Sequence, residues 1–365
     1  MRILVVNAGS SSLKLALLDD GDEVVSETIA TPQGRIDEAA LRDVIGRCTP
    51  IDAVGHRIVH GGTEFVEPVL LSPEVVRRLR SLADLAPLHQ PTSLLGVDVV
   101  ARALPDVQAV GCFDTAFHAD MPAQASTYAL PSEWRRRWDL RRFGFHGLSH
   151  SWICGSVVDL MGQPVEAIRV VSCHLGAGAS LCAIDRGRSV DTTMGFTPLE
   201  GLVMATRSGS VDPGLVLWLE EHVGMPPSEL AATLEHRSGL LGLTGTADMR
   251  SILKAEAEGD PEAGLAVELY LHRLRAGIAS MAAAMDGFDA IAFTGGVGEN
   301  AAPIRGRVAD GLRFLGVEID PEANAAAHPD AEIGAAKAGV RTFVIRSRED
   351  VEIARQVMSV LGGAS

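Results

Sequence analysis

The chain begins with a short apolar run, a polar turn and a second apolar run. Residues 1–6, MRILVV, are apolar except for one arginine, and residues 13–18, LKLALL, follow a cluster of Asn, Gly and Ser. Leucine and β-branched residues on either side of small turn residues are typical of a hairpin. The sequence therefore predicts two strands joined by a tight turn at the N-terminus.

A similar pattern recurs near the middle of the chain. Apolar residues at Val170 and Val171 lead into a Gly/Ala/Ser turn, and SLCAID at residues 180–185 follows it. Both copies have the form strand, small-residue turn, Ser-Leu, apolar strand, Asp, which pairs Ser12 with Ser180. An internal repeat of this kind indicates two lobes on the same plan, each presenting a turn toward the space between them.

The rest of the chain alternates between strand and helix patterns. AIAFTGGVGEN at residues 290–300 predicts a strand and a turn, and residues 300–316 predict one helix capped by Gly316. Pro73 after Ser72 opens another helix, and residues 263–285 predict a long one. This alternation predicts an α/β protein.

Composition narrows the class of protein. A chain of 365 residues, 47% of them hydrophobic, favours two domains. A net charge of -15 without a basic block argues against a nucleic-acid partner. The five cysteines are scattered without a CxxC pair, which is typical of reduced thiols in a cytoplasmic protein. No apolar run has the length of a signal-peptide core or a membrane span, so no membrane association is expected.

Three small-residue turns are candidates for phosphate binding. They lie at Gly9, at Gly176 and Gly178, and at residues 295–298. Backbone N–H groups in such turns reach phosphate oxygens because no side chain blocks them, and Lys14 adds a cationic donor. The GxxxxGK[ST] pattern is missing from the sequence, so the chain is not a P-loop protein.

Histidine and arginine are concentrated beside glycine in the segments between these turns. One such residue is more often structural, but several in glycine-rich loops favour a cleft for a small anion. The segments are GHRIVHGG (His56, Arg57, His60), APLHQP (His89), CFDTAFH (Asp114, His118), RRFGFHGLSH (His146, His150) and MATRSGSVDP (Arg207, Asp212).

The sequence favours magnesium over zinc as the metal. His146 and His150 have helical spacing, but HGLSH lacks the glutamate of HExxH and has no obvious third ligand. Hard oxygen ligands suit Mg²⁺, and Asn7, Asp114 and Glu349 could supply them if the fold brings them together.

Together these motifs resemble the acetate kinase family. The resemblance rests on NAGSSSLKLALLD, GHRIVHGG, FDTAFH, RRFGFHGLSH, CHLGAGAS, DTTMGFTPLEGLVMATRSGSVDP, FTGGVGEN and SREDVEIAR, which occur in order along nearly the whole chain. It implies two ribonuclease-H-like, actin-like lobes around a nucleotide cleft, with residues 1–118 and 351–365 in the N-terminal lobe and residues 119–350 in the C-terminal lobe. It also implies a homodimer.

The resemblance implies roles for matching residues. Asp114, His146 and Arg207 would be catalytic, and Asn7 and Glu349 would lie beside Mg²⁺ or Mn²⁺. The implied substrate-binding residues are Arg57, Val59, Leu88, His89, Phe145 and Pro198. The implied ATP/ADP-binding residues are Asn7, Ser10, Ser12, Lys14, His174, Leu175, Gly176, Ala177, Gly178, Asp248, Met249, Arg250, Gly296, Val297, Gly298, Glu299 and Asn300.

The implied activity is reversible transfer of the ATP γ-phosphoryl group to acetate, giving acetyl phosphate and ADP by direct in-line transfer. A carboxylate is already an anionic nucleophile at neutral pH and needs charge compensation rather than a base. The alternatives are a propionate or other short-chain carboxylate kinase, a phosphohydrolase, and a nucleotide-gated binding protein of the same fold. Arg57, His146 and Arg207 argue against the last two, because neither needs to hold a second small anion.

Four motifs depart from the family's usual sequence. Ala177 stands where HLGNG has Asn, and residues 347–350 read SRED where TNEE is usual, which puts Arg348 beside Glu349. LHQP replaces LHNP, and ATRSGSVDP replaces GTRSGDIDP. These changes bear on acyl-chain preference and on the phosphoryl donor.

Overall fold

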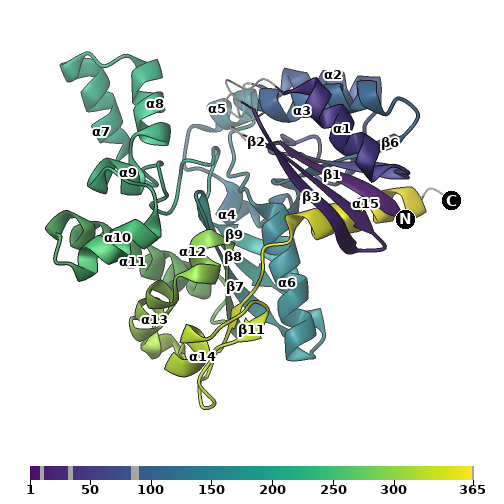
Figure 1. Cartoon of the computed structure of the whole chain (residues 1–365). Helices are drawn as coiled ribbons and strands as arrows, with labels where there is room; N and C mark the ends of the chain where they lie inside the picture. The colour runs from purple at the N-terminus through teal and green to yellow at the C-terminus, as the bar shows by residue number, and fades with distance from the viewer. Residues whose placement is uncertain (9–11, 32–35, 84–89, 364–365) are drawn as a thin grey trace. The chain divides into compact units, whose positions relative to one another are not determined.

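The computed structural model describes residues 1–8, 12–31, 36–83 and 90–363, which form two compact units. Unit 1 comprises Met1–Ala119, Phe145–Trp152 and Arg348–Ser365, and unit 2 comprises Asp120–Gly144 and Ile153–Ser347. Each unit contains one six-stranded sheet of parallel and antiparallel strands, with helices packed against it (Figure 1). The expected α/β class is confirmed.

The unit boundary differs from the sequence-based division, which assigned residues 119–350 to one lobe. Residues 145–152 belong to unit 1, because the backbone N–H of Gly147 donates to the carbonyl of Asp114 and Leu148 packs in the same core as Ile353. Unit 1 also begins its C-terminal segment at Arg348 rather than at residue 351.

The sheet of unit 1 has the strand order β3-β2-β1-β4-β6-β5. Strand β1 pairs antiparallel with β2 and parallel with β4, and β4 pairs parallel with β6. The strands are β1 (Arg2–Ala8), β2 (Ser12–Asp19), β3 (Asp22–Ala30), β4 (Ala53–Ile58), β5 (Val69–Leu70) and β6 (Gln108–Phe113).

The sheet of unit 2 repeats this plan. Its order is β9-β8-β7-β10-β12-β11, with antiparallel pairs at both ends and parallel pairs in the middle. The repeat predicted from the two hairpins is thus confirmed and extends to all six strands. The strands are β7 (Arg169–Leu175), β8 (Ala179–Asp185), β9 (Arg188–Thr192), β10 (Ala290–Thr294), β11 (Ala331–Glu332) and β12 (Arg341–Val344).

The strand register corrects how the two hairpins are aligned. Asn7 in β1 pairs with Lys14, and His174, at the same place in β7, pairs with Ser180. Ser180 therefore corresponds to Lys14 and not to Ser12, a shift of two residues that keeps the same face of the strand.

Helices cover both faces of the unit 1 sheet. Helices α1 (Glu38–Cys48) and α3 (Gln90–Ala103) pack through Leu41 and Val99 on the face that carries Leu4 and Val54. On the opposite face, α15 (Glu349–Gly362) packs against Ile3 and Val5. Helix α2 (Pro73–Ser81) begins at the predicted Ser72 cap, whose hydroxyl accepts from the N–H of Val75.

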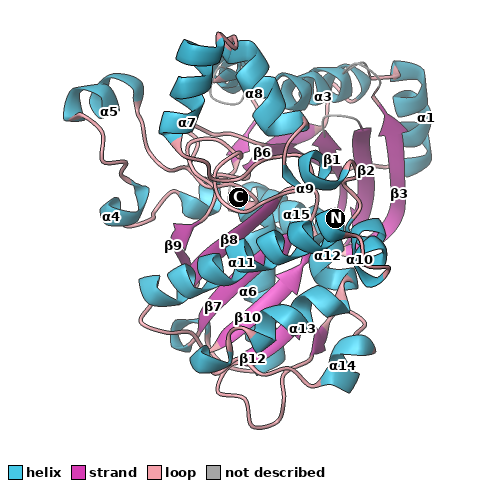
Figure 2. Cartoon of the chain, turned by 90° about the vertical axis from the view of Figure 1, so that its left-hand side faces the viewer, coloured by secondary structure: helices cyan, strands magenta, loops and turns pink. Residues whose placement is uncertain are grey.

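In unit 2, the long predicted helix is α11 (Pro261–Ala284), which crosses β7 and β8 (Figure 2). The other helices include α4 (Ala123–Ser126), α5 (Ser132–Trp138), α7 (Pro213–Trp218), α8 (Pro227–His236), α9 (Gly239–Thr244), α10 (Met249–Ala257), α12 (Gly295–Asn300), α13 (Ala302–Asp310) and α14 (Pro321–Ala325). Helix α6 (Gly147–Met161) starts in unit 1 and continues in unit 2.

Two local predictions in unit 2 were wrong. Residues 295–300 form α12 rather than a turn, and the helix predicted to reach Gly316 ends at Asp310, before the short 3₁₀ helix η6 (Arg313–Leu315). The break falls at Gly311, where a β-carbon would lie 2.5 Å from Nε of Arg275. The neighbouring atoms belong to a flexible arginine side chain, so the break is better explained by glycine's low helix propensity.

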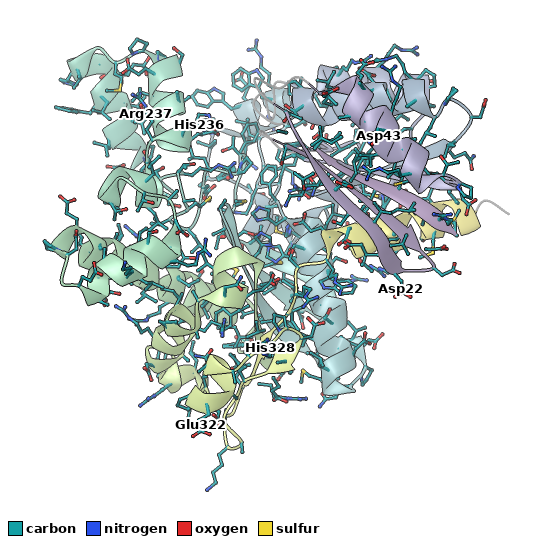
Figure 3. The ribbon with its side chains drawn as sticks, viewed as in Figure 1. Asp22, Asp43, His236, Arg237, Glu322 and His328 are labelled. Carbon is teal, nitrogen blue, oxygen red and sulfur yellow. The ribbon has the colours of Figure 1, made fainter. Side chains whose placement is uncertain are left out.

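Charged side chains such as Asp22, Asp43 and Glu322 lie on the surface (Figure 3). Within the described ranges, no helix is both long and apolar enough to cross a membrane.

Candidate active site

Arg57 is the centre of a charged cluster in unit 1. Its Nη2 lies 2.6 Å and its Nε 3.0 Å from the two carboxylate oxygens of Asp114, so the pair is bidentate. Its Nη1 donates to Oδ1 of Asn7 at 3.1 Å, and its Nε lies 3.8 Å from Oε2 of Glu349. Four residues separated widely in the sequence are thereby joined around one guanidinium group.

The strand order explains why these residues meet. Strands β4 and β6 are parallel neighbours with Arg57 beside Cys112, and the N–H of Asp114 donates to the carbonyl of Ile58. Parallel strands end at the same edge of a sheet, so the residues that follow them lie together. Arg57 faces the α15 side of the sheet, because Gly55 on the same face lies against Ile353 and Val357.

Burial opposes the charged form of both members of this ion pair. Asp114 is 1% exposed, and burial raises the pKa of its carboxyl group, while the charge of Arg57 acts in the opposite direction. Burial lowers the pKa of Arg57, but the carboxylates of Asp114 and Glu349 outweigh it, and the net pKa is raised. Arg57 is therefore a permanent cation held in one orientation by both oxygens of its partner.

The N-terminal hairpin presents polar side chains next to this cluster. Lys14 pairs with Asn7 across the hairpin, and Ser12 and Lys14 alternate with the buried Leu13 and Leu15. Ser12 and Lys14 thus share a face of β2, as the sequence predicted. Ser10, together with Leu88 and His89, lies outside the described residues.

The segment Phe145-His146-Gly147 is fixed beside Asp114. Gly147 donates its N–H to the carbonyl of Asp114 at 2.8 Å, and a β-carbon at Gly147 would lie 2.3 Å from that oxygen, so only glycine fits. His146, immediately before α6, has a left-handed φ of 56°, which is rare outside glycine and is typical of functional positions. Nε2 of His118 lies 3.0 Å from the carbonyl of Phe145 and steadies the same segment.

Two predicted pocket residues in unit 1 are apolar and buried. Val59 follows β4, and Phe145 makes an edge contact with the ring of His60, with the ring centres 5.5 Å apart. Pro198, the third described member of the implied methyl pocket, belongs to unit 2 and is also buried.

Oxygen atoms around Arg57 are suitable ligands for a magnesium ion. Asn7 contributes an amide oxygen, and Asp114 and Glu349 contribute carboxylates. Protein sites for Mg²⁺ commonly supply only one or two carboxylates and leave the rest of the shell to water and phosphate oxygens. The described residues contain no cluster of three or more His, Cys, Asp or Glu, so a site closed by protein ligands alone is not formed by them.

In unit 2, two glycine-rich segments lie side by side. Strand β10 pairs parallel with β7, with Thr294 beside His174. The turn after β7 is closed by a bond from the N–H of Gly176 to the carbonyl of Gly178. A β-carbon at Gly176 would lie 3.9 Å from the backbone nitrogen of Gly296. The residues predicted to bind phosphate, Leu175, Gly176, Ala177 and Gly178, therefore adjoin Gly296, Val297 and Gly298 of α12.

The side chains of Glu299 and Asn300 hydrogen-bond to the backbone of these segments. Oε1 of Glu299 accepts from the N–H groups of Gly295 and Ser347, and the side-chain amide of Asn300 donates to the carbonyl of Gly296. The side chain of Glu299 thus fixes the start of α12 and the segment that leads to Glu349.

Arg207 lies in a loop that contacts the turn at Ala177. The N–H of Ala205 donates to the carbonyl of Ala177, and the carbonyl of Arg207 accepts from Met204. Asp248, Met249 and Arg250 lie at the start of α10, where the carboxylate of Asp248 accepts from the N–H of Arg250 and caps the helix. Met249 is buried, and Arg250 is exposed.

Sequence reasoning missed an arginine clamp in unit 2. Nη1 of Arg142 donates to the carbonyls of Thr192, Thr193 and Met194, and its Nη2 donates to Glu200 at 2.7 Å. The hydroxyl of Tyr128 donates to the same carboxylate at 2.6 Å. These contacts fix the loop that carries Pro198. The only signal in the sequence was the pair of arginines at the start of RRFGFHG, whose contacts cannot be predicted from spacing.

Comparison with known proteins agrees with this geometry. The family model described as the acetokinase family matches residues 35–355. The acetate kinase of Geobacillus kaustophilus is 40% identical over 389 aligned positions covering 98% of each chain. Among solved structures, the Porphyromonas gingivalis acetate kinase is 33% identical with a TM-score of 0.90, covering 99% of each chain. A propionate kinase from Francisella tularensis is 34% identical with a TM-score of 0.91, covering 97% of this chain and 98% of its own. The chain belongs to the acetokinase family.

Proposed function

We propose that this protein catalyses reversible transfer of the γ-phosphoryl group of ATP to acetate, giving acetyl phosphate and ADP. The observation that carries the proposal is the buried, bidentate pair of Arg57 and Asp114, with Asn7 and Glu349 at the same guanidinium group. A fixed cation at the end of a strand is suited to a small carboxylate, and the family to which the chain belongs supports this substrate class.

In this mechanism the substrate carboxylate attacks the γ-phosphorus directly, so no general base is required. The barrier comes from bringing two anions together, which in a low-dielectric site about 4 Å apart costs several kcal/mol. Arg57 orients the attacking carboxylate, and Arg207 and His146 stabilise charge on the transferring group. Asp114 holds Arg57 in position, since both of its oxygens face that guanidinium group.

The proposed cofactor is Mg²⁺ or Mn²⁺, held by the carboxylates of Asp114 and Glu349 with the amide oxygen of Asn7 nearby. When bound, it would neutralise charge on the phosphate oxygens of the nucleotide. Backbone N–H groups at Ala177, Gly178 and Gly296 would hold phosphates, with Ser12 and Lys14 as further donors, because the N–H groups of Gly176 and Gly295 already donate within the protein. Residues 248–250 and 296–300 would contact the nucleoside.

Propionate is the second candidate substrate. It is favoured by the solved propionate kinase from Francisella tularensis, which has a fold similar to that of this chain. One methylene in an apolar pocket changes the free energy of the transition state by only about 1 to 3 kcal/mol, so Val59, Phe145 and Pro198 alone do not decide between the two acids.

We also propose a cytoplasmic homodimer. Helix α7 and the following π-helical turn η5 (Leu219–Val223) expose Leu215, Leu217, Trp218 and Val223, each about half exposed. Exposed apolar residues grouped in this way often mark a subunit interface. The five cysteines are all buried thiols, which is consistent with a reducing compartment. Light scattering after size-exclusion chromatography would give the mass, and a monomer would contradict the dimer.

The activity is tested by incubating the protein with ATP, Mg²⁺ and a series of short carboxylates in the presence of hydroxylamine. Acyl hydroxamate is expected with acetate, and the ratio of kcat/KM for acetate and propionate ranks the two substrates. Free phosphate without hydroxamate would show a phosphohydrolase instead. Omitting the metal should abolish the reaction.

The donor is tested at Ala177, the position where relatives usually have asparagine. Ala177 is exposed, so Ala177→Asn has room for an added hydrogen bond. We expect KM for ATP to fall about fivefold, corresponding to about 1 kcal/mol for one hydrogen bond. Ala177→Leu has a side chain of similar size without a donor and serves as the control. Pyrophosphate in place of ATP should give no hydroxamate; a faster reaction with pyrophosphate would contradict ATP as the donor.

A further inference from the structure

A cavity of about 550 Å³ lies in unit 1 between α2, α3 and the strands β4 and β6. Its walls are mainly apolar and include Val54, Leu71, Val76, Val97, Val100 and Leu104. This volume is in the range of small-molecule sites, which combine apolar walls with a few polar groups.

The buried polar group of this cavity is His56. Its side chain lines the cavity and is only 2% exposed. No hydrogen bond joins its imidazole to another described residue. Burial lowers the pKa of His56 to about 3, so at neutral pH the ring has one N–H donor and one nitrogen acceptor. A ligand in the cavity can hydrogen-bond to this donor or acceptor.

A cation is available at the rim of the same cavity. Arg77 and Arg80 both line it, and Arg80 is paired with Asp98 through two contacts of 2.6 and 2.7 Å. Arg77 is exposed and forms no ion pair with another described residue. The polar groups available to a ligand are therefore a neutral donor and acceptor inside the cavity and one guanidinium group at the rim.

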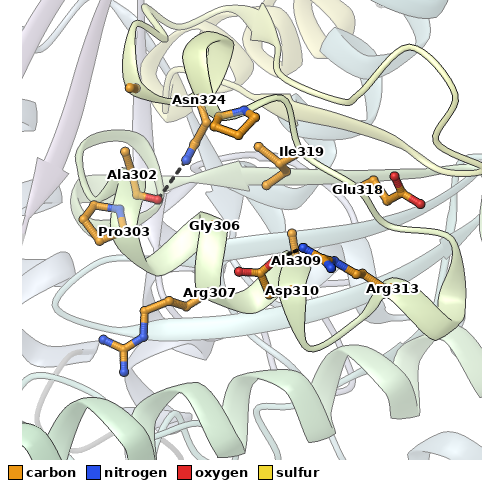
Figure 4. Close-up of a pocket in the computed structure, with 12 residues that line it drawn as sticks. Ala302, Pro303, Gly306, Arg307, Ala309, Asp310, Arg313, Glu318, Ile319 and Asn324 are labelled. Atoms are coloured by element: carbon orange, nitrogen blue, oxygen red, sulfur yellow. Dashed lines mark hydrogen bonds and ion pairs between the residues drawn. The ribbon is translucent and has the colours of Figure 1, made fainter.

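A second cavity, of about 570 Å³ in unit 2, shows the contrast (Figure 4). Its buried amide, Asn324, donates to the carbonyl of Ala302 and accepts from Arg305. Three of its charged groups are paired, Arg307 with Glu256 and Arg313 with Asp310, while Glu318 is exposed at its edge. The two cavities therefore differ in their buried polar group, which is bonded within the protein at Asn324 and has no described protein partner at His56.

We propose that the His56 cavity binds a small organic acid with an apolar body and a distal hydroxyl or carbonyl group. The carboxylate pairs with Arg77, the body packs on the apolar walls, and the distal polar group hydrogen-bonds to His56. This site is separate from the cluster around Arg57, because adjacent residues of a strand face opposite sides of the sheet.

The cavity is nevertheless linked to that cluster through the backbone of β4, where His56 immediately precedes Arg57. A ligand that contacts His56 therefore acts on the strand that carries the catalytic cation, and we expect it to change KM for the carboxylate substrate. This second step rests on the proposed function, whereas binding itself does not.

Binding is tested by isothermal titration calorimetry with three probes. They are 3-(4-hydroxyphenyl)propanoate, 3-phenylpropanoate, which lacks the hydroxyl, and 4-ethylphenol, which lacks the carboxylate. The first probe should bind the intact protein most tightly. Saturating acetate should not compete it away and should shift its Kd only by the factor by which the probe shifts acetate binding. Removing either polar group should weaken binding about tenfold, which corresponds to one charged or buried hydrogen bond.

Two variants locate the site. Arg77→Ala should weaken binding of the first probe about tenfold and leave 4-ethylphenol unaffected, while Arg78→Ala, whose side chain pairs with Glu64, is the matched surface control. His56→Phe should abolish the difference between the hydroxylated and unhydroxylated acids. No binding of any probe at about 10 mM, or equal binding by Arg77→Ala and the intact protein, would overturn the site. Binding without any effect on KM would leave the site standing and refute its coupling to Arg57.

Discussion

The two sheets have the same strand order but carry different chemistry at the same position. In unit 1, Asn7 of β1 lies between Lys14 of β2 and the end of β4, where Arg57 donates to it. In unit 2, His174 of β7 lies between Ser180 and Thr294. The same strand order therefore places two cations, Lys14 and Arg57, beside Asn7 in unit 1. In unit 2 it places two hydroxyl groups, those of Ser180 and Thr294, beside His174.

The segments after these strands differ in the same way. In unit 1, Arg57 at the end of β4 is paired with Asp114, which follows β6. After β10 the chain turns at Gly295, which has a φ of 78°, and begins α12 at once. A β-carbon at Gly295 would lie 2.8 Å from the carbonyl of Leu175, so the glycine allows two backbones to approach. At these matching positions unit 1 thus brings charged side chains together, and unit 2 brings two backbone segments together.

The largest expected effect comes from removing Arg57, which has an uncharged threonine, Thr294, at the matching position of unit 2. Arg57→Ala should lower kcat about 10³-fold, because the attacking carboxylate loses the cation that orients it. It should also lower the free energy of unfolding by about 3 to 5 kcal/mol, because Asp114 is left buried without its partner. Steady-state kinetics and urea unfolding measure the two effects.

Two controls separate activity from stability. Arg57→Ala combined with Asp114→Asn should recover much of the stability but none of the activity. Thr294→Val, at the matching position of unit 2, should change kcat less than tenfold. A loss at Thr294 as large as at Arg57 would mean that the two positions are equivalent in function.

The next effect concerns the glycine that brings α6 to Asp114. Gly147→Ala should destabilise the protein by about 2 to 4 kcal/mol and lower kcat, because the β-carbon would overlap the carbonyl of Asp114. Gly155→Ala in the same helix has nothing within 4 Å of the new carbon and should be neutral or stabilising by up to about 1 kcal/mol. Equal stability of the two variants in urea would contradict the packing argument.

A pH effect follows from another difference between the sheets. His56 in unit 1 corresponds to Phe293 in unit 2, since Val6 pairs with His56 and Cys173 with Phe293. Burial lowers the pKa of His56 to about 3 and that of His60 to about 4. Both histidines have a pKa near 6.5 in the unfolded chain. Between pH 6.5 and the lower pKa of the folded state, each histidine is therefore protonated in the unfolded chain and neutral in the folded one.

These two histidines do not lower the free energy of unfolding above pH 6.5. Below pH 6.5, each lowers it by about 1.4 kcal/mol for every pH unit. His56→Phe should make unfolding less sensitive to acid by about one proton between pH 6 and pH 5, as measured by urea titrations. An unchanged pH slope would show that His56 is not buried in its neutral form.

The smallest effect is expected at Arg142, whose contacts hold the loop of Pro198 in unit 2. Arg142→Lys keeps the charge but loses the fork that donates to three carbonyls and to Glu200, so the loop carrying Pro198 should loosen. KM for the carboxylate should rise about tenfold with little change in kcat, since ground-state and transition-state binding are weakened alike. Arg136→Lys on the exposed face of α5 is the control. A fall in kcat without a rise in KM would argue that Arg142 acts on the reaction step instead.

The sequence predicted those helices and strands whose signals lie within a few neighbouring residues. The hairpin of β1 and β2, the Ser72 cap of α2 and the long α11 were predicted because alternation, capping residues and helical periodicity act over a few residues. The prediction failed at residues 145–152, where contacts with Asp114 and Ile353 decide the outcome. Those partners are distant in the sequence, and no local pattern encodes them.

The sequence by itself determined the repeated hairpins, the glycine turns and the motifs that identify the family. Only the tertiary structure decided which chemical groups act together. Arg57 and Asp114 are joined because β4 and β6 are parallel neighbours, and Arg142 reaches the loop of Pro198 through carbonyls fifty residues away. Strand order and side-chain contacts of this range depend on the packing of the whole unit, since each contact must offset the entropy of closing a long loop before it can form.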